Sequence, residues 1–134
     1  MTVSPEQKRV FIESLRHIVI EEANVTQQRI TQEWVKPIAR RVADGRAIEG
    51  VRFVGLGHEG HLRFECDRNY SRFREGDTLH LSRGNPFFQP SANVTLEEED
   101  ETHLLLSISE GSFDINQLSD QPTGWVLDEG YMNL

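Results

Sequence analysis

The sequence predicts an α+β fold: a long N-terminal helix, kinked or broken near Pro37, followed by a small antiparallel β-barrel of five or six strands. Two observations predict it. Apolar residues recur at three- and four-residue intervals over roughly the first 40 residues, which is helical spacing. From Ala47 onward the period drops to two, and turn residues separate short apolar runs. Short strands at this spacing are typical of a small closed barrel.

A helix start precedes the apolar stripe. Ser4 can cap the first turn, Pro5 suits the first helical position, and Gln7 completes a capping box. The stripe consists of Ile12, Leu15, Val19, Ala23, Ile30, Trp34, Ile38 and Val42. Asp44-Gly45 follows as a C-terminal cap. The predicted helix therefore covers roughly 40 residues and is about 60 Å long.

Pro37 interrupts this helix, because proline lacks an amide hydrogen and its ring clashes with the preceding turn. We expect a kink or break over residues 33–36 and two collinear helices. A helical hairpin folded back at Pro37 is the alternative. Since so long a helix exceeds a small barrel, we expect part of the stripe to contact something other than the barrel.

Apolar runs with a period of two predict the strands. Their apolar positions are Val51 and Phe53; Leu62, Phe64 and Cys66; Leu79 and Leu81; Val94 and Leu96; Leu104, Leu106 and Ile108; and Trp125 to Leu127. We divide the chain into residues 1–46, a stalk helix or helical hairpin, and residues 47–134, the barrel. The two parts are expected to form one structural unit.

The charge of the chain is divided between its two ends. The net charge is −8, yet residues 1–83 carry all 14 lysines and arginines against 12 acidic residues, while residues 84–134 carry 10 acidic residues and no base. Segregated bases permit a basic surface on an acidic chain. A single cysteine, with no signal peptide or membrane-spanning stretch, predicts a cytoplasmic protein without a membrane partner.

One glycine-rich segment resembles a ligand-binding motif. The spacing of Gly55, Gly57 and Gly60 matches a dinucleotide-binding pattern, but strand-like alternation follows it at once, so we interpret it as a hairpin turn. His58 and His61 lie on the same turn and lack a second cluster of ligands. The segment therefore predicts neither a dinucleotide site nor a metal site.

Other reactive side chains also have structural interpretations. Cys66 continues an alternating apolar run, which predicts a buried small residue rather than a nucleophile. The acidic run over residues 97–101 predicts a solvated turn between two strands. We therefore expect no catalytic residue, metal or cofactor in this chain, and a stand-alone enzyme is the weakest functional hypothesis.

Two loops, residues 67–74 and residues 82–88, combine guanidinium groups with aromatic rings. Guanidinium groups bind phosphates and aromatic rings stack on bases, which favours nucleic-acid contact. The predicted nucleic-acid-binding residues are Arg68, Tyr70, Arg72, Arg74 and Arg83. Ion pairing with Asp67, Glu75 and Asp77 is the alternative. The same surface could include Lys36, Arg40 and Arg41, for which solvated helix charges are the alternative.

The long charged helix, the strand Gly50-Val51-Arg52-Phe53-Val54 and the motif Phe73-x-x-Gly76-Asp77-x-Leu79-x-Leu81-Ser82-Arg83-Gly84 together resemble a known arrangement. This is the stalk and β-barrel accessory region of superfamily-one helicases related to the nonsense-mediated-decay helicase. The resemblance covers most of the chain in layout. Its specific part is residues 73–85.

The resemblance implies a non-catalytic accessory module of a helicase-like ATPase, beside the nucleic-acid channel, which helps to grip or regulate the strand. Arg72, Arg74 and Arg83 are then the positions that face phosphates, and the apolar stripe near Trp34 is expected to dock elsewhere than on the barrel. The chain lacks a phosphate loop, so it would be a fragment of an ATP-dependent DNA or RNA helicase, with ATP and Mg²⁺ bound only by a downstream motor domain. That motor and single-stranded DNA or RNA are the implied partners. A protein-interaction or regulatory domain without a nucleic-acid role is the alternative.

Overall fold

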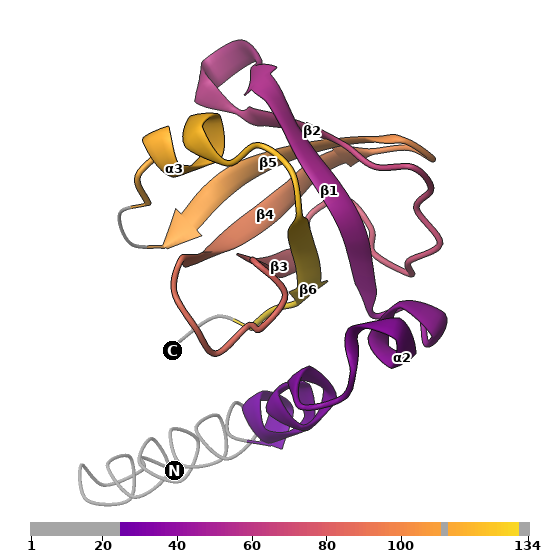
Figure 1. Cartoon of the computed structure of the whole chain (residues 1–134). Helices are drawn as coiled ribbons and strands as arrows, with labels where there is room; N and C mark the ends of the chain where they lie inside the picture. Colours follow the sequence, from indigo (N-terminus) through magenta and orange to yellow (C-terminus); the bar gives the residue numbers. More distant parts are fainter. Residues whose placement is uncertain (1–24, 111–112, 132–134) are drawn as a thin grey trace, which may run out of the picture.

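The computed structural model describes residues 25–110 and 113–131, and its centre is a closed antiparallel barrel (Figure 1). The strands are β1 (Ala47–Leu56), β2 (Leu62–Glu65), β3 (Thr78–Ser82), β4 (Ser91–Glu99), β5 (His103–Glu110) and β6 (Trp125–Glu129). They follow one another around the barrel in the order β1-β2-β5-β4-β3-β6. The predicted antiparallel barrel is therefore confirmed, with six strands.

The long strand β1 closes the barrel by pairing with β2 on one side and with β6 on the other. Phe53 lies opposite Phe64 of β2, and Ala47 lies opposite Asp128 of β6. The register shifts in both ladders of β1, and such irregularities bend a strand and increase its twist. The ten-residue strand β1 can thus pair with both β2 and β6 and close the barrel.

The barrel interior is filled by the residues that the alternating pattern predicts. Trp125 and Phe64 are the largest of the fully buried side chains, and leucines from five of the strands surround them. Cys66 belongs to the same cluster, which confirms its predicted burial. Phe53 and Ile108 pack against the cluster but remain partly exposed.

The connections also follow the sequence pattern. The glycine-rich segment is confirmed as a hairpin, in which the short 3₁₀ turn η1 (His58–Gly60) joins β1 to β2. The acidic run is only partly a turn, because β4 extends through Glu99 before residues 100–102 lead into β5. The short helix α3 (Asn116–Asp120) precedes β6, and its Leu118 is buried in the core.

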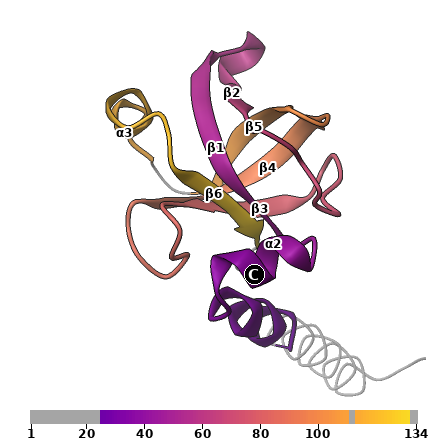
Figure 2. The ribbon, with the colours of Figure 1, turned by 45° about the vertical axis from the view of Figure 1, so that its right-hand side comes forward.

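The helical part of the chain lies at one end of the barrel (Figures 1 and 2). Residues 25–34 are helical, and α2 (Ile38–Ala43) begins directly after Pro37. The predicted break near Pro37 is therefore confirmed. The structure does not support a long helix: α2 has only six residues, and the predicted helix before residue 25 lies outside the described residues. No helix within residues 25–110 and 113–131 is long and apolar enough to cross a lipid bilayer.

The expectation that the apolar stripe near Trp34 docks elsewhere is wrong. Ile30 and Trp34 are buried, and the Trp34 indole N–H donates to the backbone oxygen of Glu129 at 2.8 Å. The Trp34 ring also packs against Tyr131 and His80, with centroid separations of 5.6 and 4.7 Å. The barrel end is large enough to bury this part of the stripe, and the stripe positions before residue 25 lie outside the described residues.

Candidate nucleic-acid interface

The segment over residues 66–77 crosses from β2 to β3, which are not neighbours in the barrel. Backbone hydrogen bonds fix its path: the Asn69 N–H donates to the Glu101 oxygen, the Arg72 N–H to the Gly45 oxygen and the Gly76 N–H to the Leu96 oxygen. Phe73 anchors its centre in the core. The crossing segment, as we call residues 66–77, is thus held to the β4–β5 turn at one end and to the α2–β1 turn near its middle.

Side chains of the crossing segment alternate between solvent and protein. Arg68, Tyr70, Arg72 and Arg74 are exposed, whereas the residues between them are half-buried or buried. Asn69 and Ser71 turn toward the protein and share a hydrogen bond, and Phe73 is buried. Alternate residues of an extended segment lie on one side. Four of the five predicted nucleic-acid-binding residues are therefore brought together along one exposed edge.

Arg68 and Tyr70 form the first half of this edge. The Arg68 guanidinium lies 5.2 Å from the centroid of the Tyr70 ring, and Tyr70 is 65% exposed. Arg68 also approaches the Glu101 carboxylate at 3.6 Å, with both side chains mostly exposed. Exposed ion pairs of this kind contribute little stability and exchange readily with solvent. The aromatic ring of Tyr70 and the cation of Arg68 are thus exposed to solvent side by side.

The aliphatic part of the Arg72 side chain is held in place, while its guanidinium has no partner among residues 25–110 and 113–131. A Cβ atom at Gly45 would lie 3.1 Å from Arg72 Cγ and 3.3 Å from its Nε, so the side chain runs closely over this glycine. Gly45 also has a φ of 75°, which glycine adopts more readily than other residues. Among the described residues, no carboxylate lies within ion-pairing distance of Arg72.

Arg74 begins the turn that leads into β3. Its backbone N–H donates to the Asp77 carboxylate at 2.8 Å, and its guanidinium has no ion-pair partner among the described residues. Asp67 pairs with Arg52 of β1 at 2.9 Å. Asp67 is therefore engaged outside the segment and Asp77 by a backbone N–H, so neither forms an ion pair with the guanidinium group of Arg72 or Arg74.

The structure places Arg83 away from the other four predicted residues. It follows β3, whereas Arg74 precedes it, and this five-residue strand spans about 13 Å between its ends. The Arg83 guanidinium donates to the Thr123 backbone oxygen at 2.5 Å and lies 4.9 Å from the Trp125 ring centroid. Arg83 therefore supports the segment before β6 and lies apart from the crossing segment.

The helix cations, which the sequence leaves open between an extension of the basic surface and solvated charges, are engaged in local contacts. Lys36 pairs with Glu33 at 2.8 Å, and Arg40 lies 3.3 Å from the Asp44 carboxylate. Arg41 is buried and bonded to Asp128, so it is not a solvated helix charge either. No local pattern in the sequence signals the burial of Arg41, because its partner lies 87 residues away along the chain.

A groove of about 530 Å³ lies beside Arg72, between the crossing segment, the α2–β1 turn and the end of β6. Arg46 lines it and donates to the Glu129 carboxylate at 2.9 Å, and Arg29 donates to the same carboxylate at 2.6 Å. Burial would raise the pKa of Glu129, but the hydrogen bonds from the two arginines outweigh it and hold that pKa below its ordinary value. Glu129 is therefore charged in the folded protein near neutral pH.

A buried polar cluster under α2 has no counterpart in the sequence pattern. Arg41 of α2 donates to Asp128 of β6, whose second carboxylate oxygen has no hydrogen-bond partner within residues 25–110 and 113–131. Burial raises the pKa of Asp128, and Arg41 offsets this only in part. Nearby, the ring nitrogens of His80 lie 2.8 Å from the oxygens of Asn93 and Pro86.

No group of three or more histidine, cysteine, aspartate or glutamate side chains in the described ranges is arranged to hold a metal ion. A second groove, near His58 and His61, is lined by several carboxylates and by Arg63, an exposed arginine of β2. The chain matches no protein-family model, no curated protein and no solved structure.

Proposed function

We propose that the chain is a non-catalytic module that contacts single-stranded nucleic acid through the exposed edge of its crossing segment. The observation that carries the proposal is the alternation at Arg68, Tyr70, Arg72 and Arg74, all of which face solvent from one extended stretch. The guanidinium groups of Arg72 and Arg74 have no carboxylate partner among the described residues. They supply charge for phosphates without breaking an internal ion pair.

The edge has the two chemical properties that single-strand binding requires. Guanidinium groups neutralise phosphates and release counterions, and an open aromatic face stacks on any base. Tyr70 is 65% exposed and has Arg68 over its ring, so a base could stack on its free face. Such an edge favours binding without strong sequence preference.

The wider proposal is that this module belongs to a helicase-like ATPase, in which it lies beside the strand and helps to grip it. Its support is the resemblance of residues 73–85 and of the overall layout to helicase stalk and barrel regions. ATP and Mg²⁺ would be bound by the motor, which is the expected protein partner.

The test measures binding of a fluorescent single-stranded oligonucleotide by anisotropy at several salt concentrations. Replacing Arg72 and Arg74 together by alanine is expected to weaken binding and to reduce the slope of log K against log salt by about 1.4, or about 0.7 for each phosphate contact. Tyr70→Ala should weaken binding with little change in slope. The matched control is Arg63→Ala, which removes one exposed arginine of β2 that has no ion-pair partner in the part of the chain that the structure describes. Equal binding by the double variant and the wild type would sink the site assignment.

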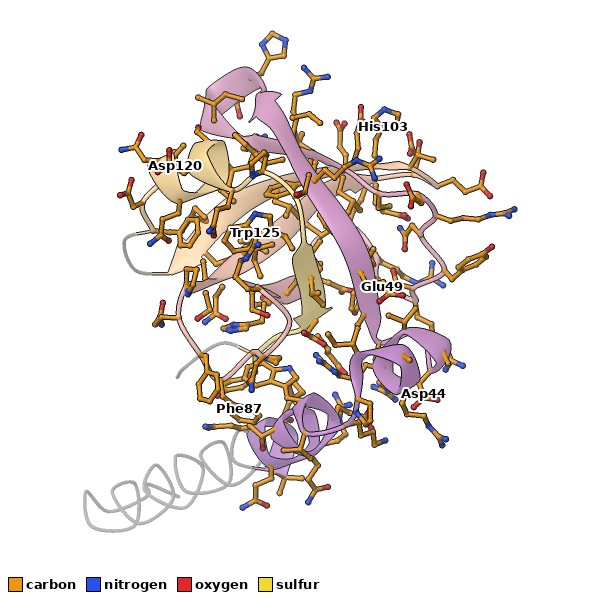
Figure 3. All side chains as sticks on the ribbon, in the orientation of Figure 1. Asp44, Glu49, Phe87, His103, Asp120 and Trp125 are labelled. Carbon is orange, nitrogen blue, oxygen red and sulfur yellow. The ribbon has the colours of Figure 1, made fainter. Side chains whose placement is uncertain are left out.

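A second candidate function, protein interaction, is favoured by one apolar patch. Phe87 and Phe88 are 50% and 68% exposed, and Val35 is 73% exposed on the linker before Pro37. Phe87 lies at the end of the barrel that the helical residues cover (Figure 3) and packs edge-on against Trp34. Because these exposed side chains are apolar, we expect the patch to meet an apolar protein surface such as that of the motor.

The two candidate functions are distinguished by measuring whether the chain binds the purified motor domains, by light scattering and by titration. Phe87→Ser combined with Phe88→Ser should abolish motor binding if the patch is the interface, while strand binding by the isolated chain stays unchanged. Motor binding that survives this change would exclude the patch as the interface.

A further inference from the structure

We propose that the groove beside Arg72 is a phosphate-binding site in which Arg72 and Arg46 hold the anion and Glu129 competes for Arg46. The inference rests on the proposed function in taking the phosphate to be part of a bound strand. It adds a defined subsite to the exposed edge. Both arginines line the groove, together with Gly45, Gly76 and Gly130.

Arg72 is already positioned for an anion. Its backbone N–H is bonded to the Gly45 oxygen at 3.0 Å, and its stem lies against the same glycine. Most of the entropy that a flexible arginine loses on binding is therefore lost on folding. Since its guanidinium has no partner among the described residues, it can donate two parallel hydrogen bonds to phosphate oxygens.

Glu129 sets the charge available in the groove. Its carboxylate accepts hydrogen bonds from both Arg29 and Arg46, so two cations share one anion. Asp77, the other carboxylate that lines the groove, accepts a backbone N–H from Arg74. Arg46 and Arg72 line the groove opposite the two carboxylates, and Arg29 bonds to Glu129 from outside the lining. A phosphate that enters can take Arg46 while Arg29 continues to neutralise Glu129.

An aromatic ring at the edge of the groove favours a nucleotide over a bare phosphate. Tyr131 lines the groove and stacks on Trp34 at 5.6 Å with an interplanar angle of 29°. The Tyr131 hydroxyl accepts a hydrogen bond from Gln27 at 3.3 Å. The volume suits a unit of nucleotide size, since small-ligand pockets begin at about 300 Å³. The phosphate could be a diester of a strand or the monoester of a free nucleotide.

The experiment follows backbone amide NMR signals of the whole chain during titration with three probes at constant ionic strength. The probes are inorganic phosphate, adenosine monophosphate and an oligothymidylate without terminal phosphates. We expect phosphate to shift the amides of Gly45, Arg46, Gly76 and Gly130. Arg72→Ala should weaken phosphate binding at least about tenfold, the loss expected for a charge-assisted hydrogen bond. The matched control, Arg63→Ala, should leave it unchanged.

Glu129→Gln tests the competition directly. Because the amide no longer holds two cations strongly, this variant should bind phosphate more tightly than the wild type, whereas a purely structural role for Glu129 predicts no gain. The amide NMR spectrum of the variant is recorded as well, because it shows whether the variant that binds phosphate is folded. A folded Glu129→Gln variant with unchanged or weaker phosphate binding would overturn the competition.

The three probes separate this inference from the proposed function. Groove shifts with the oligothymidylate identify a strand diester as the ligand, and groove shifts with adenosine monophosphate alone identify a free nucleotide. In the second case the groove site stands and the strand-binding function fails. Strand binding at Tyr70 without groove shifts from any probe overturns the groove site and leaves the function standing.

Discussion

Arg41 and Asp128 form a buried ion pair that joins α2 to β6 across 87 residues of sequence. Both side chains are almost completely inaccessible to solvent. Arg41 also donates to the backbone oxygens of Lys36 and Gly84, at 3.0 and 2.8 Å. One guanidinium thus connects the linker after the helical residues 25–34, the loop after β3 and the last strand.

Replacing Arg41 by alanine should therefore destabilise the fold strongly. The change leaves a buried carboxylate without its cation, and breaking a buried pair in this way typically costs about 3–5 kcal/mol. Urea denaturation measures the loss. The matched control is Arg40→Ala, which removes a neighbouring but exposed arginine paired with Asp44 and should cost less than about 1 kcal/mol. Similar losses for the two variants would contradict the argument.

The double variant Arg41→Met with Asp128→Leu should recover most of the stability that Arg41→Ala loses. Burying two charges costs several kcal/mol of desolvation, so apolar side chains of similar volume are often no worse than a buried ion pair. The same urea series tests this. A double variant as unstable as Arg41→Ala would show that the hydrogen bonds to Lys36 and Gly84 matter more than the pair.

The stability of the folded chain should depend on pH through Glu129. Its pKa in the folded protein lies below the ordinary value of 4.5, so its carboxylate favours the folded state above that pH. This contribution is lost as pH falls through the folded-state pKa. Glu129→Gln should therefore be less stable than the wild type at pH 7, by about 1 kcal/mol for partly exposed partners. The difference should shrink as urea denaturation is repeated toward pH 3. A gap that stays constant with pH would exclude the ion pairs as its source.

Gly130→Ala should destabilise the barrel although Gly130 is not a turn glycine with positive φ. A Cβ atom there would lie 2.7 Å from the backbone carbon of Leu79, which cannot move without disturbing β3. We expect a loss of about 2–3 kcal/mol, at the upper end for overpacking, in thermal denaturation. Gly57→Ala is the matched control, because its Cβ would meet only side-chain atoms at 3.3 Å. Equal effects would show that the close approach at Leu79 is unimportant.

Cys66 should be unreactive until the barrel unfolds. It is 2% exposed, and burial raises the pKa of its thiol, so little thiolate is present at neutral pH. Labelling with a thiol reagent should be slow in buffer and fast in denaturing urea. Fast labelling of the folded chain would mean that the end of β2 opens readily.

The strands could be predicted because burial repeats every second residue. Leu62 and Phe64 of β2, like Leu104 and Leu106 of β5, point inward as their spacing indicates. The order of strands around the barrel is not contained in that local pattern. Nor could the docking of Trp34 be predicted, since a helical apolar stripe shows that a face is buried without showing against what.

The candidate site could be predicted in part for the same reason. The even-numbered positions from Arg68 to Arg74 share one exposed edge, and the burial of Phe73 between them is the signal that groups them. Arg83 was predicted with them by residue type, but it lies beyond the other end of β3. Asp128 alternates with the inward-facing Leu127, which predicts exposure. It is buried only because α2 covers it, and such long-range coverage leaves no mark in the neighbouring sequence.

Closure of the barrel limits which parts of this chain can bind a partner. Each of the six strands has a paired neighbour on both sides, so within the described residues no strand lies at a sheet edge along its whole length. Backbone pairing with a full added strand is therefore disfavoured, and we expect partners to be recognised by side chains on the connections between the strands. Substitutions in the crossing segment or in the loop after β3 could therefore change what is bound while the scaffold stays the same.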